Sequence, residues 1–124
     1  DLNTVKYSTN PYNINRMTMA AGEGVLIDEE YTRKNCETII ENRTALSNEL
    51  EKMGFILTPS QTNFVFARHP EIDGGYLYEK LKANGILVRH FGGEKICQYN
   101  RITIGTADQM DALVLAIRKI LEEK

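Results

Sequence analysis

Residues 85–106 read GILVRHFGGEKICQYNRITIGT and contain two short apolar runs, 86–88 and 102–104, each typical of a strand. Arg89 closes the first run and Arg101 opens the second. A guanidinium is always charged, and its planar fork matches a carboxylate or a phosphate through two parallel hydrogen bonds. Neighbouring strands would bring the two arginines together as a clamp for a small anionic substrate. A single arginine at a strand end is usually solvated or paired with a nearby carboxylate.

The segments on either side of this stretch predict further strands and helices. Two more strands are expected at residues 55–57 and 63–67, each ended by turn-forming residues. A helix is expected over residues 76–84, with Gly85 as its stop.

The last helix has a clear start signal in the sequence. Thr106 is placed to cap it, and Gln109 stands at the capping-box position three residues later. Its apolar stripe follows helical spacing and consists of Met110, Leu113, Val114, Ile117, Ile120 and Leu121.

Helical periodicity also governs residues 14–53. A first helix from Ile14 is expected to end or kink near Asp28, because two glycines weaken its middle. A second helix is expected from Asp28 to Met53, with Gly54 as its stop. The predicted inward stripe of this helix is Tyr31, Ile39, Leu46, Leu50 and Met53.

This order of elements predicts an α+β fold with two layers, in which a small, mostly antiparallel sheet carries helices on one face. A long connecting helix would precede it. Residues 1–13 are polar and turn-rich, with a bend expected at Asn10–Pro11, and they would form a lead-in segment to one domain over residues 14–124. Because there is no initiator Met, we also expect the chain to be a piece of a longer polypeptide.

Composition narrows the classes of partner. The chain has 124 residues, 26% of them charged, and a formal net charge of −2, so no basic face favours nucleic acid. No apolar run approaches the length of a membrane span, and no signal peptide is visible, so a cytoplasmic protein is expected. Cys36 and Cys97 would be reduced thiols, and they share no metal-binding spacing with His69 or His90.

Four short motifs carry a family resemblance. Pro11-Tyr12-Asn13-Ile14-Asn15 resembles the PYNVN segment of histidinol-phosphate aminotransferases, which are fold-type I enzymes dependent on pyridoxal phosphate. Three further motifs match in the same order, namely Thr58 to Phe64, Gly85 to Arg89, and Arg101 to Thr106. The resemblance covers nearly the whole chain from Pro11 to Leu121.

The resemblance implies that the chain is the C-terminal small domain of such an enzyme, preceded by part of the interdomain helix. The position matching Arg101 binds the carboxylate or phosphate of the substrate in the family, and the one matching Arg89 assists with the substrate phosphate. Tyr12 and Asn13 would line the mouth of the site, although they could equally only shape the turn into the first helix.

The same resemblance places the cofactor machinery elsewhere. The lysine, the aspartate, the tyrosine and the phosphate-binding residues that hold pyridoxal phosphate in the family would lie upstream, in a large domain of the same polypeptide. This chain alone is therefore expected to be inactive, within a parent enzyme that is a homodimer. Histidinol phosphate is the implied substrate, while aromatic amino acids and threonine phosphate remain open through related enzymes.

Two other classes of function fit parts of the pattern. A free-standing ferredoxin-like module that binds an anion or regulates another protein would have a similar order of strands and helices. A purely structural interaction domain would have no affinity for anions.

Overall fold

The computed structural model describes residues 2–8 and 14–123. The chain divides into two compact units, residues 1–35 and 36–124, which are described separately. Helix α3 (Glu29–Lys52) contributes its first turns to the first unit and the rest to the second.

The first unit is helical. Helix α1 (Leu2–Ser8) occupies part of the segment expected to be turn-rich, so that expectation is wrong over these residues. The reason is that residues 2–8 contain neither Gly nor Pro; the expected bend at Asn10–Pro11 lies outside the described residues. Helix α2 (Arg16–Ile27) begins two residues later than expected, because the Asn15 side chain accepts the Thr18 N–H at 2.9 Å and caps it.

No residue of α1 or α2 is buried. Asp28 separates α2 from α3, and its carboxylate accepts the Tyr31 N–H at 3.1 Å, as expected for a helix start. Tyr31 itself is 64% exposed, so its predicted inward position is wrong. The stripe becomes buried only further along α3, where Leu46 and Leu50 reach the core of the second unit.

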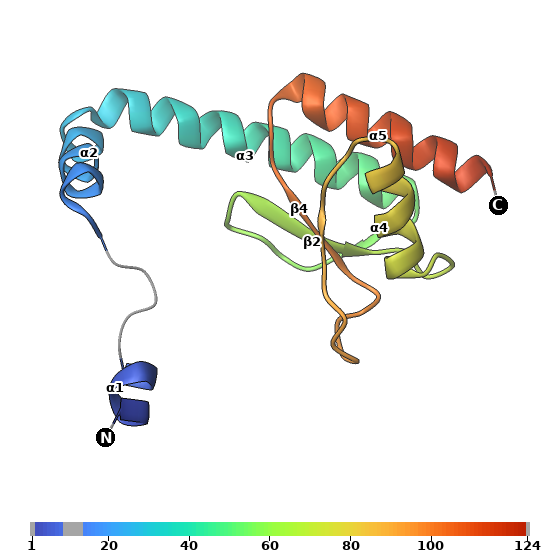
Figure 1. Ribbon diagram of the computed structural model, residues 1–124. Helices are drawn as coiled ribbons and strands as arrows, with labels where there is room; N and C mark the ends of the chain where they lie inside the picture. The colour runs from blue at the N-terminus through green and yellow to red at the C-terminus, as the bar shows by residue number, and fades with distance from the viewer. Residues whose placement is uncertain (1, 9–13, 124) are drawn as a thin grey trace. The chain divides into compact units, whose positions relative to one another are not determined.

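The second unit is built on a four-stranded sheet with the order β1-β2-β4-β3, in which every neighbouring pair is antiparallel (Figure 1). The strands are β1 (Ile56–Leu57), β2 (Phe64–Arg68), β3 (Arg89–His90) and β4 (Asn100–Thr103). All four strands are short, and β1 and β3 form the two edges.

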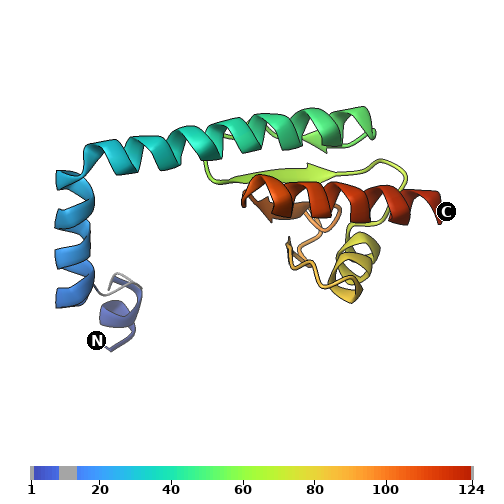
Figure 2. The same cartoon turned by 90° about the horizontal axis from the view of Figure 1, so that it is seen from above.

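One face of this sheet is covered by helices. Val65, Ala67 and Ile102 alternate with exposed or half-buried neighbours along their strands, and each is at most 2% exposed. They pack against α3, α4 (Gly74–Ala83) and α5 (Ala107–Glu122) in one hydrophobic core. Figure 2 shows α5 beside the C-terminal half of α3, and an Arg118–Glu49 ion pair of 2.7 Å joins these two helices. The predicted two-layer α+β fold is confirmed.

The third strand differs from its prediction, since β3 comprises Arg89 and His90 rather than residues 86–88. Gly85 takes a left-handed φ of 77° after α4, and the Ile86 N–H returns to the Leu81 carbonyl at 2.9 Å. This helix stop sends residues 86–88 away from the ladder, and pairing with β4 begins only at Arg89. Ile86 and Val88 therefore pack against the core without forming a strand, and Leu87 is exposed.

The capping box at α5 is present as predicted. The Thr106 hydroxyl accepts the Gln109 N–H at 3.4 Å, and the Gln109 side chain accepts the Thr106 N–H at 3.0 Å. We expect Thr106→Ala to lower the free energy of unfolding by about 1 kcal/mol, because the Gln109 N–H loses the hydroxyl that accepts it. Urea unfolding measures the change, and Thr106→Ser, which keeps the hydroxyl, is the control. Equal losses in both variants would contradict the capping role.

Candidate anion-binding site

The structure brings the two predicted arginines together. Arg89 and Arg101 are direct cross-strand partners in the β3–β4 ladder, and Phe66 of β2 is the partner of Arg101 on its other side. All three lie on the sheet face opposite the helices, because Val65 and Ile102, their neighbours along the strands, are buried beneath. Both guanidinium groups belong to exposed residues.

Aromatic rings support the arginines on this face. The Arg101 guanidinium carbon lies 5.3 Å from the centre of the Phe64 ring and 6.0 Å from that of Phe91. Arg89 lies 5.3 Å from the same Phe91 ring. A cation held over a ring face gains about 0.5–1 kcal/mol at an exposed site. The rings thus favour a fixed place for each guanidinium over free movement in solvent.

Phe66 and Arg68 extend the same surface. Phe66 stacks on Tyr99 with ring centres 4.6 Å apart, and the Arg68 Nε donates to the Tyr99 hydroxyl at 3.3 Å. We call the whole surface the arginine–aromatic face, made of Phe64, Phe66, Arg68, Arg89, Phe91, Tyr99 and Arg101. Sequence reasoning missed the aromatic members, although the two-residue period of residues 64–68 is a signal that places Phe64 and Phe66 on one face with Arg68.

The arginine pair has no carboxylate partner in the described parts of the chain. Ion pairs in that part of the chain are made by other cations, among them Lys52, Lys80, Lys82 and Arg118. Two positive charges side by side repel one another, so an anion between them would relieve that repulsion as well as accept hydrogen bonds. The arrangement is therefore suited to holding one carboxylate or phosphate.

A hydrogen-bonded network ties the loop that precedes Arg101 to the start of α4. Asp73 caps α4 by accepting the Tyr76 N–H at 2.9 Å, and its second oxygen accepts the Gln98 amide at 3.1 Å. Gln98 in turn accepts the Gly74 N–H at 3.2 Å. The pKa of the Asp73 carboxyl is lowered from its usual value, first by the Tyr76 N–H and then by the Gln98 amide. The ionised form of Asp73 therefore stabilises this junction.

Stability should depend on Asp73 in a pH-dependent way. A carboxyl with a lowered folded-state pKa contributes stability above its unfolded pKa, near 4, and loses it as the pH falls through the folded pKa. We expect Asp73→Asn, which keeps a capping oxygen, to cost about 0.5 kcal/mol at pH 7, since solvent screens this exposed group. Urea unfolding of both proteins at pH 7 and in strong acid should show the difference vanish in acid. A difference that persists there would refute the ionic contribution.

The two other predicted site residues, Tyr12 and Asn13, lie outside the described residues. Whether they reach the arginine pair therefore stays a prediction.

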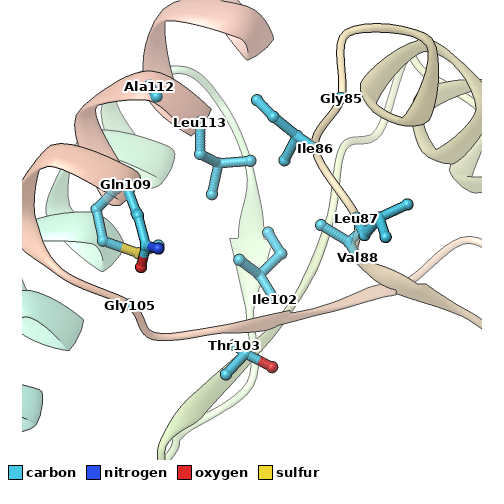
Figure 3. Close-up of a pocket in the computed structure, with 11 residues that line it drawn as sticks. Gly85, Ile86, Leu87, Val88, Ile102, Thr103, Gly105, Gln109, Ala112 and Leu113 are labelled. Atoms are coloured by element: carbon cyan, nitrogen blue, oxygen red, sulfur yellow. The ribbon is translucent and has the colours of Figure 1, made fainter.

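A hollow of about 350 Å³ lies elsewhere, between residues 85–88, β4 and the first turns of α5 (Figure 3). The side chains of Ile86, Ile102 and Leu113 point into it. No charged residue lines this hollow, so its chemistry does not match an anion.

Two further features of the described residues bear on the class of protein. No group of three or more potential metal-ligating His, Cys, Asp or Glu side chains occurs in residues 2–8 and 14–123. None of the helices described there is long and apolar enough to cross a membrane.

The fold and the sequence together define the class of protein. The sequence model of class I and II aminotransferases matches residues 2–117, so the chain belongs to that family. Within the family it is similar to histidinol-phosphate aminotransferase 2 of Burkholderia lata, with 43% identity over 120 residues. The enzyme of that name from Clostridium beijerinckii is 42% identical over 120 residues. Each alignment covers 97% of this chain and 34% of the relative, so the chain spans about a third of their length.

Solved structures agree with this assignment. Histidinol-phosphate aminotransferase from Clostridium acetobutylicum superposes with a TM-score of 0.78 at 26% identity, over 97% of this chain and 37% of that one. The enzyme from Sinorhizobium meliloti, solved in complex with pyridoxal-5'-phosphate, gives a TM-score of 0.79 at 23% identity. That alignment covers 97% of this chain and 33% of the solved one, and at this identity it supports the fold alone.

Proposed function

We propose that this chain is the small, substrate-closing domain of a pyridoxal-phosphate-dependent aminotransferase that acts on histidinol phosphate in histidine biosynthesis. In this proposal Arg101 and Arg89 bind the anionic group of the substrate, and Tyr12 and Asn13 line the mouth of the site. The domain covers residues 14–124, with part of the interdomain helix at its start. The observation that carries the proposal is the cross-strand pair of arginines without a carboxylate partner among the described residues.

The identity of the relatives supports the choice of substrate. Relatives more than 40% identical over nearly the whole chain are named histidinol-phosphate aminotransferases. Their substrate carries a phosphate, and a guanidinium fork accepts phosphate and carboxylate alike, so one arginine pair could serve both an amino donor and the phosphate substrate.

In this proposal the residues that hold the cofactor lie outside this chain. Pyridoxal phosphate needs a lysine amine close to the bound substrate, and strands β2, β3 and β4, which carry most of the arginine–aromatic face, contain no lysine. When bound in the longer protein, the cofactor supplies the electron sink for amino-group transfer. The contribution of this chain is to bind and orient the substrate anion and to exclude water as the domain closes.

The longer enzyme would be a cytoplasmic homodimer in which this domain packs on a large cofactor-binding domain. A free-standing ferredoxin-like module is the less favoured reading, because the match to the aminotransferase family extends over residues 2–117 and includes the helices before the sheet. A purely structural role is tested by phosphate titration, since it predicts no affinity for the anion.

The visible absorption spectrum of the full-length protein that carries this chain tests the proposal. We expect the absorption band of bound pyridoxal phosphate, and we expect histidinol phosphate to bleach it. A band that responds only to other amino acids would keep the enzyme class and change the substrate. A protein without any such band would overturn the proposal.

A further inference from the structure

A buried amide lies directly beside the arginine pair. Among the residues that the structure describes, Asn100 is the one buried polar side chain, with 1% exposure. Its Nδ2 donates to the Gly74 carbonyl of α4 at 2.9 Å, while its Oδ1 is buried without a hydrogen-bond partner. Burying an amide that is only partly satisfied costs free energy. An apolar side chain at position 100 would avoid this cost. The presence of an asparagine there therefore needs a physical explanation.

The ladder that sets the arginines side by side is very short. β3 pairs with β4 through only two residue pairs, Arg89 with Arg101 and His90 with Asn100. A slip of one residue would turn the side chains of one strand to the opposite face. The apolar run 86–88, which would resist such a slip by its pattern, lies outside the strand. Other contacts must therefore hold the register.

Besides its four residue pairs with β2, β4 is held by contacts between the residues just before Arg101 and the start of α4. A Cβ atom at Gly74 would lie 2.5 Å from the Cys97 carbonyl oxygen and 2.7 Å from the backbone of Gln98, so the two segments are in direct contact. Gln98 adds the side-chain bonds to Gly74 and Asp73, and Asn100 adds the bond to the Gly74 carbonyl. Residues 97–100 are thereby fixed to a helix end, and Arg101 follows immediately.

His90 completes the arrangement from the other strand. Its Nδ1 is also buried without a hydrogen-bond partner, and it is the cross-strand partner of Asn100. The histidine Nδ1 can donate a proton and the Asn100 Oδ1 can only accept one, so the two atoms are chemically complementary. This pair lies on the helix-facing side of the same two strands that carry Arg89 and Arg101 on the open side.

From these contacts we infer that Asn100 is a positioning residue, which holds β4 in the register that places Arg101 beside Arg89. This inference rests on the proposed role of the arginine pair in anion binding. Asn100 itself does not contact the anion. It acts only by fixing the position of the two guanidinium groups. It follows that Asn100 contributes to anion affinity only while Arg89 is present.

A double-mutant cycle tests this dependence. The 124-residue chain is titrated with inorganic phosphate, and the arginine Nε–Hε resonances give the dissociation constant. We expect Arg89→Ala and Asn100→Ala each to weaken phosphate binding about threefold, on the scale of an exposed ion pair. The double variant should have about the same dissociation constant for phosphate as either single variant. Once Arg89 is absent, Asn100 has no arginine pair left to position.

Independent losses, which would multiply to about ninefold in the double variant, would overturn the inference. An unchanged dissociation constant for Asn100→Ala would overturn it as well. If Asn100→Ala fails to fold, Gln98→Ala replaces it in the same double-mutant cycle. Gln98 is exposed, and its side chain is hydrogen-bonded to the start of α4. Leu121→Ala at the end of α5, which only lowers stability, is the control and should bind phosphate as the unmodified chain does.

Arg101→Ala separates this inference from the proposed function. If phosphate binding is lost in Arg101→Ala while the cycle gives independent losses, the arginine site stands and only the positioning role of Asn100 fails. If Arg101→Ala binds phosphate as well as the unmodified chain, the arginine site itself is refuted, and the inference falls with it.

Discussion

In the longer enzyme that we propose, Arg101→Ala is expected to lower kcat/KM for histidinol phosphate about a hundredfold. A hydrogen bond to a charged group contributes about 1.5–3 kcal/mol, and each 1.4 kcal/mol corresponds to a factor of about ten. Steady-state kinetics measure the loss, which should fall mainly on KM if the anion is held equally in the ground state and the transition state.

Two further variants sharpen this result. Arg101→Lys keeps the charge but loses the planar fork, so we expect an intermediate loss. Arg118→Ala removes an arginine of α5 that pairs with Glu49 on the helix side of the sheet, and it should leave kcat/KM unchanged. A wild-type specificity constant for Arg101→Ala would show that the arginine pair does not bind the substrate.

Gly74→Ala is expected to lower the free energy of unfolding by about 3 kcal/mol. Replacing glycine by alanine in a helix ordinarily stabilises the protein, by about 0.5–1 kcal/mol. At Gly74 the added Cβ would come within 3.0 Å of the Cys97 oxygen and of the Gln98 carbon and oxygen, all of them backbone atoms that cannot rotate away. Overpacking of this kind costs about 1–3 kcal/mol, and the hydrogen bonds that join Gly74 to Gln98 and Asn100 would be strained in addition.

Urea unfolding of the 124-residue chain provides the measurement. Gly24→Ala is the matched control, because no atom lies within 4 Å of a Cβ placed there, and this substitution should not destabilise the chain. If Gly74→Ala is as stable as the unmodified chain, the close approach between α4 and residues 97–98 is not a feature of the protein in solution.

Much of the fold could be predicted because its signals are local. The capping box at Thr106 and the helix stop at Gly54 depend on neighbours within a few residues, and both occur where the sequence indicates them. The alternation of residues 63–67 likewise predicts β2 to within one residue. Local propensity and tertiary packing agree at these positions.

The errors lie where distant contacts decide. Residues 86–88 have the composition of a strand, but the left-handed Gly85 directs them away from β4, and the ladder forms one step later. Tyr31 fits the helical stripe, yet the first turns of α3 have no core to enter. In both cases the apolar pattern is real, and what it packs against is set by the fold as a whole.

The site shows the same division. The arginines could be found from the sequence because a charge at the end of an apolar run is conspicuous, and the strand order then makes them neighbours. Phe91 under both guanidinium groups could not be found in this way, because it comes from the loop after β3 and its place depends on how that loop folds back. The role of Asn100 is visible only through its bond to a helix 26 residues away.

The length of the edge strands has a consequence for how the molecule behaves in a crowded solution. An exposed sheet edge is a template on which another chain can add a strand, and long, flat edges promote aggregation. Here each edge strand has only two residues, and one of them carries Arg89, whose charge disfavours a second chain. The arginine–aromatic face carries four aromatic rings. The short edge strands of the same sheet give little support to intermolecular β-sheet growth.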